Sequence, residues 1–516
     1  MFHGLGWLVC GFVSAELSGP HRGLKRTMTA FAPSLQDFAD LSTGEFPSQR
    51  LIEPGKLRLS ELISALSVAL DLTEGQPAGH AARSCIIGMK IAEQLQLPQD
   101  QLVHLYYALL LKDLGCSSNA AKMCYLFGAD ERQIKHDLKS IDWTRMQASV
   151  SFSWAHVAPE ASPLQKILKV AALFATGPEG ARRLVETRCE RGATIARDLG
   201  FSEQTALAIR SLDEHWNGKG QPDGLKGEEI PLLARILGIS QTVEVFFQLG
   251  GAAKVSEIVR ERRGTWFDPQ LVDIVLKLSN NAAFWESVAT RNALELAVQW
   301  EVPDEIQYVD DDFMDRVCFA FASVVDAKSP WTFNHSNVVA HLSRDLAKIL
   351  GFDEEMQRDM YRAGLLHDLG KLGVSNAILD KPGKPTDEEF AAIRKHPDFS
   401  EKILLNVPRF QQLADVAAAH HERMDGKGYH RRLVTEELPL HYRILAVADV
   451  YDALTAKRPY RDAMPLEKVM AIMDKDSGTS FAPEVVQALH EWIERNNPQT
   501  RVPQQLEAVD RLVDNI

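Results

Sequence analysis

The feature that most constrains the fold of this chain is an internal repeat, in which the second half restates the motifs of the first in the same order and, outside one insertion, at the same spacing. The paired segments are His80 with His335, Lys112-Asp113 with His367-Asp368, Trp216–Gly220 with Met424–Gly428, and Glu228–Leu232 with Glu436–Leu440. A chain of 516 residues is long enough for two domains. The repeat therefore predicts a tandem duplication of one folding unit.

Each unit is predicted to be helical. Apolar residues recur at helix spacing in both copies, as at Leu342, Leu346 and Ile349, and neither alternating strand runs nor a hairpin series is evident. An acidic, proline-bearing segment near Trp300–Asp312 separates the copies. We expect an all-α fold of two tandem helical bundles. The expected parts are a partly disordered tail (residues 1–55), a degenerate non-catalytic domain (56–300) and a catalytic domain (301–516).

The second copy carries seven potential metal ligands in local contexts that would hold each one still. His367-Asp368 and His420-His421 each close an apolar helical run just before turn residues. The full series is His335, His367, Asp368, His396, His420, His421 and Asp449. Seven nitrogen and oxygen donors exceed the needs of one tetrahedral zinc, and no cysteine takes part. The series predicts two divalent transition-metal ions bridged by Asp368, with iron or manganese favoured over zinc and magnesium.

A pair of such ions is suited to the hydrolysis of phosphate esters, because the ions activate water, orient the ester and neutralise charge on the attacking and leaving oxygens. Lys371, three residues after Asp368, would place an ammonium group near a phosphate oxygen. Arg458 and Arg461 would supply two guanidinium groups able to hold two phosphates of one substrate.

The stretch from about Asp326 to Asp462 resembles the HD-GYP subclass of HD-domain phosphohydrolases. The resemblance rests on linked motifs, which are Asp326–Pro330, His367–Lys371, Lys381–Gly383 with Thr386, His396-Pro397, His420–Tyr429, Val447–Leu454 and Arg458–Arg461. It implies an all-helical domain with a binuclear or trinuclear metal centre that opens the ring of cyclic di-GMP to give pGpG or GMP. The seven donors take the family's ligand positions, Asp368 and Lys371 the catalytic positions, and Gly428, Tyr429, Arg458 and Arg461 the substrate-binding positions.

Three departures from the family pattern keep other substrates open. His430 stands where the family usually has proline, and Val338 stands where it has an arginine. Trp331 replaces a glutamate that some trinuclear members carry, which favours two metals. The alternatives are a phosphodiesterase for another cyclic dinucleotide, such as mixed cyclic GMP-AMP, or for another phosphate ester, and a sensor that binds a dinucleotide without hydrolysing it.

The first copy has lost most of its ligands and is predicted to be catalytically inactive. The positions equivalent to His367, His396, His420, His421 and Asp449 hold Lys112, Arg188, Leu212, Asp213 and Gln241. This copy also contains an insertion, roughly Ser117 to Ala181, which includes Trp143 and Trp154. The insertion would pack against the second copy, receive a partner or bind a small signal. The first repeat as a whole would serve a homodimer or a signalling partner.

Charge and cysteine content limit the possible partners and the cellular location of the protein. A formal net charge of −13 argues against DNA, RNA and anionic membranes as general partners, while a local basic pocket still allows a cyclic dinucleotide. The six cysteines form no CxxC pair, as expected for reduced thiols in the cytoplasm. The apolar run Leu5–Ala15 lacks a preceding Lys or Arg and is too short to span a bilayer, so residues 1–27 are interpreted as a poor signal peptide, a disordered tail or an extension upstream of a start near Met28. No other stretch of the sequence is expected to have the length and apolarity of a transmembrane helix.

Overall fold

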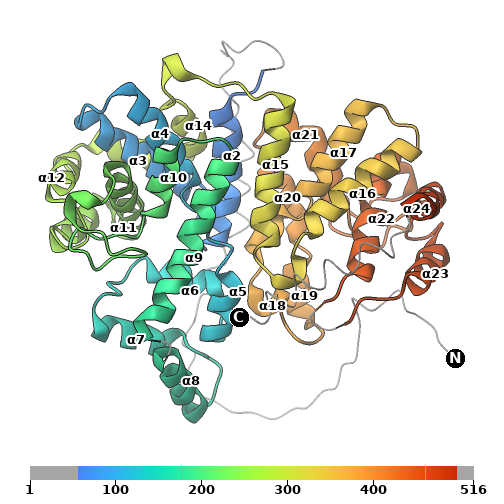
Figure 1. The fold of residues 1–516 in the computed structure, drawn as a ribbon, viewed down its shortest axis with the longest axis horizontal. Coiled ribbons are helices and arrows are strands. Elements are labelled where there is room, and N and C mark those ends of the chain that lie inside the picture. Colours follow the sequence, from blue (N-terminus) through green and yellow to red (C-terminus); the bar gives the residue numbers. More distant parts are fainter. Residues whose placement is uncertain (1–55, 176, 459–460, 497–516) are drawn as a thin grey trace.

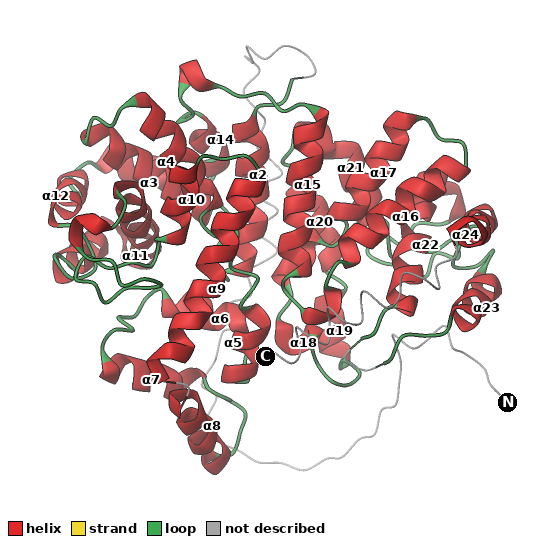
Figure 2. Ribbon diagram, viewed as in Figure 1, coloured by secondary structure: helices red, strands yellow, loops and turns green. Residues whose placement is uncertain are grey.

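The computed structural model describes residues 56–175, 177–458 and 461–496. Within these residues the chain forms helices and loops and no strand (Figure 2), which confirms the predicted all-α fold. The expected disordered tail, residues 1–55, lies outside the described residues, as do Pro459 and Tyr460 of the arginine-bearing motif.

The helices of the first half run from α2 to α14. In order they are α2 (Leu59–Thr73), α3 (His80–Gln94), α4 (Gln99–Leu111), α5 (Ala120–Phe127), α6 (Glu131–Leu138), α7 (Met146–His156), α8 (Pro163–Ala175), α9 (Gly177–Asp198), α10 (Glu203–Arg210), η1 (Gly227–Glu229), α11 (Leu232–Glu261), α12 (Pro269–Leu278), α13 (Ala282–Val288) and α14 (Ala293–Val298). They occupy the left side of Figure 1, in blue to green.

The second half repeats much of this order on the right side of Figure 1, in yellow to red. Its elements are η2 (Pro303–Glu305), α15 (Asp311–Asp326), η3 (Pro330–Thr332), α16 (His335–Ile349), α17 (Glu354–Leu366), η4 (Leu369–Gly373), α18 (Asn376–Leu379), α19 (Asp387–Ile393), α20 (His396–Leu404), η5 (Pro408–Phe410), α21 (Gln411–Ala418), η6 (Thr435–Glu437), α22 (Leu440–Thr455), α23 (Leu466–Asp476) and α24 (Pro483–Asn496).

Residues paired by the sequence repeat make matching contacts. Asp71 and Asp326 each accept a hydrogen bond from the backbone NH ten residues later, at Ala81 and Ser336. The first histidine of each copy bonds through Nδ1 to a carboxylate, His80 to Glu244 and His335 to Asp452. Both copies thus fix the start of their histidine-bearing helix in the same way.

Glycine after the second motif lets two helices approach closely. A Cβ at Gly370 would lie 2.1 Å from the carbonyl oxygen of His396, at the start of α20. The paired Gly115 would place a Cβ 1.8 Å from the carbonyl oxygen of Arg188 in α9. No other residue type fits such a gap, so these glycines set the distance between the second and third motifs.

The two halves share buried contacts, in which α2 packs against η4 and α20, and α5 packs against α18. Glu131, the first residue of α6, is fully buried and accepts hydrogen bonds from Lys328 Nζ at 2.8 Å, Ser375 Oγ at 3.1 Å and the Asn376 NH at 3.0 Å. The Arg132 guanidinium also bonds to the carbonyl of Gly373. The insertion of the first half therefore forms buried hydrogen bonds with the segment that follows the His367-Asp368 motif.

One described helix, α11, has the length and apolarity of a membrane span, contrary to the expectation that no stretch would. In the structure 61% of its apolar window is buried inside the fold, and Gly250 and Gly251 interrupt it with non-helical backbone angles. Its apolar residues pack in the core, and this accounts for the composition.

Candidate metal centre

The seven predicted ligands converge from the ends of separate helices. His335 begins α16, His396 begins α20, and His367-Asp368 directly follows α17. His420 and His421 follow α21, and Asp449 projects from α22. Six of the seven are buried, and the side chain of His421 is the partly exposed one. Residues spread over more than a hundred positions of sequence thus form one cluster.

Asp368 lies at the middle of the cluster, and its two oxygens face different histidines. Oδ2 is 3.4 Å from His335 Nε2 and 3.3 Å from His367 Nε2. Oδ1 is 3.3 Å from His396 Nε2 and 3.7 Å from His420 Nε2. A carboxylate with one oxygen turned toward each histidine pair is the geometry expected of a bridging ligand.

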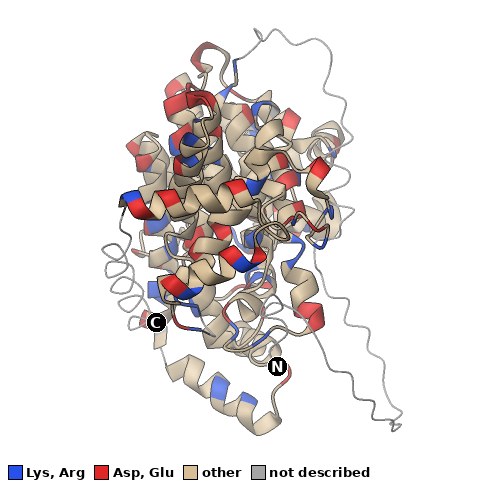
Figure 3. Ribbon diagram, turned by 90° about the vertical axis from the view of Figure 1, so that its right-hand side faces the viewer, with Lys and Arg blue, Asp and Glu red and all other residues tan. Residues whose placement is uncertain are grey.

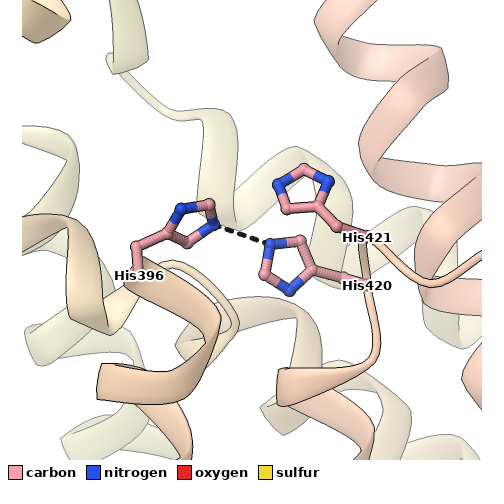
Figure 4. A group of neighbouring side chains, drawn as sticks. All are labelled: His396, His420 and His421. Carbon is pink, nitrogen blue, oxygen red and sulfur yellow. Dashed lines mark hydrogen bonds between the residues drawn. The ribbon is translucent and has the colours of Figure 1, made fainter. Parts of the chain in front are cut away.

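The second aspartate joins the same two groups. Asp449 Oδ1 lies 3.3 Å from His335 Nε2 and 3.8 Å from His367 Nε2, and its Oδ2 lies 3.8 Å from His421 Nδ1. Figure 4 shows the imidazoles of the other group facing one another, with His396 Nε2 and His420 Nε2 3.0 Å apart. The cluster therefore has two lobes, His335, His367 and Asp368 on one side, and His396, His420 and His421 on the other.

Hydrogen bonds to the far ring nitrogen orient four of the imidazoles. His367, His396 and His420 bond through Nδ1 to the backbone carbonyls of Gly364, Ile393 and Ala417, each three residues earlier in the chain. His335 Nδ1 bonds to Asp452 Oδ2 at 2.6 Å. These partners fix the tautomer with hydrogen on Nδ1, which turns the Nε2 lone pairs toward the centre of the cluster.

The protonation equilibria also suit metal ligation. Burial lowers the pKa of His421 to about 4 and depresses the pKa values of His396 and His420, so these rings are neutral near pH 7. Burial also opposes charge on His367, but Asp368 and Asp449 outweigh it and raise the pKa of His367 to about 9. Ions binding to that lobe would have to displace protons, so metal affinity would fall at low pH.

The donor set fits divalent transition metals. In each lobe the ligand atoms lie within 4.8 Å of one another. His367 Nε2 and Asp368 Oδ1 are buried and have no hydrogen-bond partner within the described part of the chain. Buried polar atoms without partners are costly unless something else binds them. Imidazoles combined with shared carboxylate oxygens suit iron, manganese or zinc better than magnesium.

Three of the predicted catalytic and substrate-binding residues lie directly against the cluster, namely Lys371, Gly428 and Tyr429. The Lys371 ammonium forms an ion pair with Asp368. The Tyr429 ring packs on His421 with centroids 4.7 Å apart, and Arg394 lies 4.7 Å from the Tyr429 centroid. A Cβ at Gly428 would come within 2.7 Å of the His421 carbonyl oxygen, so glycine lets this loop close over the histidine pair.

The two predicted phosphate-binding arginines differ in their surroundings. Arg458 Nη2 lies 3.8 Å from Asp452 Oδ2, and Asp452 bonds to His335, so Arg458 is next to the cluster. Arg461 donates to the carbonyls of Ala453 and Leu454 at the end of α22. In this arrangement the Arg461 guanidinium caps a helix.

Two residues that the sequence reasoning did not single out support the ligands. Asp452 holds His335, and it lies one helical turn after Asp449 in α22, a spacing that could have revealed it. Ser400 donates to the His367 carbonyl at 2.7 Å and accepts from the Gly370 NH at 2.8 Å. Ser400 thereby ties the second motif to α20.

The corresponding place in the first half is filled by ion pairs. Lys112 and Asp113 are buried and pair with each other, and Arg188 pairs with Asp213. Lys139 Nζ, from the insertion, lies 3.0 Å from Glu74 Oε2 and 3.9 Å from Asp113 Oδ1. Glu74, Asp113 and Cys116 are close enough to hold an ion. However, these lysine ammonium groups already neutralise the acids there.

An all-α fold in which helix ends gather histidines and aspartates is the architecture of HD-domain proteins, and the comparisons agree. The HD domain family profile matches residues 178–271 and 320–485. A Vibrio cholerae protein, 3'3'-cGAMP-specific phosphodiesterase 3, is 42% identical over 431 residues, which are 84% of this chain and 94% of that protein. A cyclic di-GMP phosphodiesterase of Thermotoga maritima is 37% identical over 34% of this chain and 49% of its own length.

A solved structure matches most of the chain. The crystal structure of a cyclic GMP-AMP-specific phosphodiesterase of V. cholerae is 38% identical, covers 85% of this chain and 98% of its own, and superposes with a TM-score of 0.60. The chain belongs to the HD-GYP family of HD-domain phosphohydrolases. It is a metal-dependent phosphohydrolase.

Proposed function

We propose that this protein hydrolyses a cyclic dinucleotide at a centre of two divalent ions, iron or manganese, held by His335, His367, Asp368, His396, His420, His421 and Asp449. The proposal includes a cytoplasmic location and a catalytically inactive first half. The observation that carries it is the position of Asp368, whose two oxygens each face a different lobe of imidazoles at 3.3–3.7 Å.

Different side chains of the site would have different roles in the reaction. Bound ions would supply an activated water and polarise the phosphoryl oxygens. Opposing burial, His367 and Lys371 hold the pKa of Asp368 well below its usual range, so this ligand stays ionised. Lys371, whose side chain is 19% exposed, would reach a phosphate oxygen as charge develops. Tyr429 with Arg394 would offer an aromatic and cationic wall beside His421.

Two substrates are favoured by different observations. The first is 3'3'-cyclic GMP-AMP, because the relative specific for it matches this chain across both halves. The second is cyclic di-GMP, the substrate implied by the sequence motifs, because the T. maritima relative aligns with about a third of the chain. Arg458 beside Asp452 would bind a phosphate of either one.

The repeat offers a matched control for the decisive experiment. We expect His367→Ala with Asp368→Ala to abolish hydrolysis and to lower the bound iron or manganese measured by elemental analysis. Lys112→Ala with Asp113→Ala removes the paired residues of the first half, and we expect it to retain both activity and metal. Rates and products would be compared for cyclic GMP-AMP and cyclic di-GMP by chromatography. Unchanged turnover in the first variant would overturn the site assignment, and binding without hydrolysis by metal-loaded wild type would favour a sensor.

A further inference from the structure

The insertion in the first half has an unusually apolar exposed surface. Of the fifteen large apolar side chains that are exposed in the described residues, eight lie between Tyr125 and Phe174, so this small part of the chain holds more than half of them. They come from α5, α7 and α8, and α8 packs against each of the other two helices. Such a concentration is typical of an interaction site rather than of scattered surface residues.

Helix α8 provides the centre of this surface. It buries no residue fully, and it projects at the lower edge of the molecule in Figures 1 and 3. Four of its large apolar residues form one stripe at helical spacing, with exposed fractions of 68% for Leu164, 51% for Ile167, 62% for Leu168 and 39% for Phe174. Ala171 lies between them on the same face.

The charges of α8 lie away from this stripe. Lys166 Nζ is 5.6 Å from the centroid of the Trp154 ring in α7. Lys169 Nζ lies at Gly128, just after α5, 2.7 Å from where a Cβ would stand. Helices that lie on membranes present Lys and Arg on their polar face, free to meet anionic lipids. Here Lys166 is only partly exposed and lies over a ring of α7, which leaves Lys169 as the one exposed basic side chain of the helix. Because the net charge of the chain is also −13, a protein partner fits better than a lipid surface.

We propose that this surface is a homodimer interface in which α8 packs antiparallel against α8 of a second copy. An isologous contact of this kind places the same patch on both partners. Antiparallel pairing about Lys169 would set Leu164 against Phe174 of the partner subunit, and Ile167 against Ala171 of the partner subunit, so that the two apolar stripes face each other along their length. The four large apolar side chains of the α8 stripe expose an area on the order of 400 Å² on each partner, which is the size of a weak, concentration-dependent interface rather than a permanent one.

The test is the oligomeric state of the full-length protein, measured by sedimentation velocity from 1 to 100 µM. The proposal predicts a dimer, and Ile167→Glu with Leu168→Glu should raise its dissociation constant by roughly 100-fold or more, because like charges would meet in an apolar seam. The matched control Gln165→Glu adds a charge to the same helix beside the stripe and should leave the dimer intact. Circular dichroism should be the same for all three proteins, since these side chains are exposed.

Three results would overturn the proposal. The first is a wild-type protein that stays monomeric at 100 µM. The second is a dimer that persists in the double glutamate variant, which would place the contact elsewhere. The third is a monomer that sediments with vesicles of phosphatidylcholine and phosphatidylglycerol and is released by the same substitutions, which would make α8 a membrane-binding helix. Hydrolysis does not enter the test, so the proposed function stands or falls separately.

Discussion

The ion pair between Glu131 and Lys328 joins the two halves of the chain, and its removal should destabilise the protein strongly. The side chains are 0% and 1% exposed, and Lys328 Nζ lies 2.8 Å from Glu131 Oε1. Burial lowers the pKa of Lys328 even though Glu131 opposes this, so the ammonium group depends on its counter-charge. Glu131→Gln keeps the shape of the side chain but leaves the ammonium uncompensated. A loss of about 3–5 kcal/mol in the free energy of unfolding is expected.

The second variant isolates the charge. Glu131→Gln with Lys328→Met removes both charges, so most of the lost stability should return, giving a large coupling energy in a double-mutant cycle. Guanidinium unfolding followed by tryptophan fluorescence would measure the stability of wild type, of the single variants Glu131→Gln and Lys328→Met, and of the double variant. A loss below about 1 kcal/mol for Glu131→Gln, or a double variant no more stable than the single one, would refute the view that this pair is buried and coupled.

Three further outcomes are expected. Burial raises the pKa of Asp71 to about 7, so between pH 4 and 7 the folded state binds a proton that the unfolded state has released. The free energy of unfolding of wild type, relative to that of Asp71→Asn, should therefore fall by on the order of 4 kcal/mol as the pH rises from 4 to 7. Urea titrations at several pH values would measure this fall. Gly370→Ala should lower stability by about 1–3 kcal/mol and reduce bound metal, because the added Cβ meets the His396 carbonyl, whereas Gly373→Ala, whose Cβ meets only side chains at 3.3 Å or more, should change both less. Lys371→Ala should lower kcat by about 100-fold with metal content retained, whereas the exposed Lys395→Ala should leave kcat unchanged, and equal losses in both variants would contradict the role of Lys371.

Local sequence patterns were sufficient to predict the helices and the residues that form the cluster. His367-Asp368 and His420-His421 stand at helix ends because apolar runs stop there at glycine-bearing turns, and this information is contained in a few neighbouring residues. The all-α fold follows from the same periodicity. The close approach of Gly370 to His396 could be predicted only in part, because a glycine in a motif predicts close packing but does not identify the residue it packs against.

Contacts between distant segments could not be predicted in this way. Glu131 accepts hydrogen bonds from Ser375 and Asn376 only because the two halves of the chain pack together, and no local pattern near Glu131 predicts that contact. The carbonyl contacts of Arg461 depend on where α22 ends relative to the next loop. The apolarity of α11 does not by itself distinguish a buried core helix from a membrane span, and the distinction depends on its burial in the fold. The stripe on α8 could likewise be identified as exposed only from the packed structure.

The ion pairs in the first half also bear on how such a protein can evolve. Lys112 and Arg188 stand at the positions paired with His367 and His396, and each pairs with an aspartate: Lys112 with the buried Asp113, and Arg188 with the partly exposed Asp213. On the proposed duplication, reverting Lys112 alone to histidine would leave the buried Asp113 carboxylate with only the Lys139 ammonium, 3.9 Å away, before any ion could be held, and such an intermediate would fold less well than its parent. The lost site would then be closed to recovery by single mutations, which leaves the first half free to diverge only toward other uses.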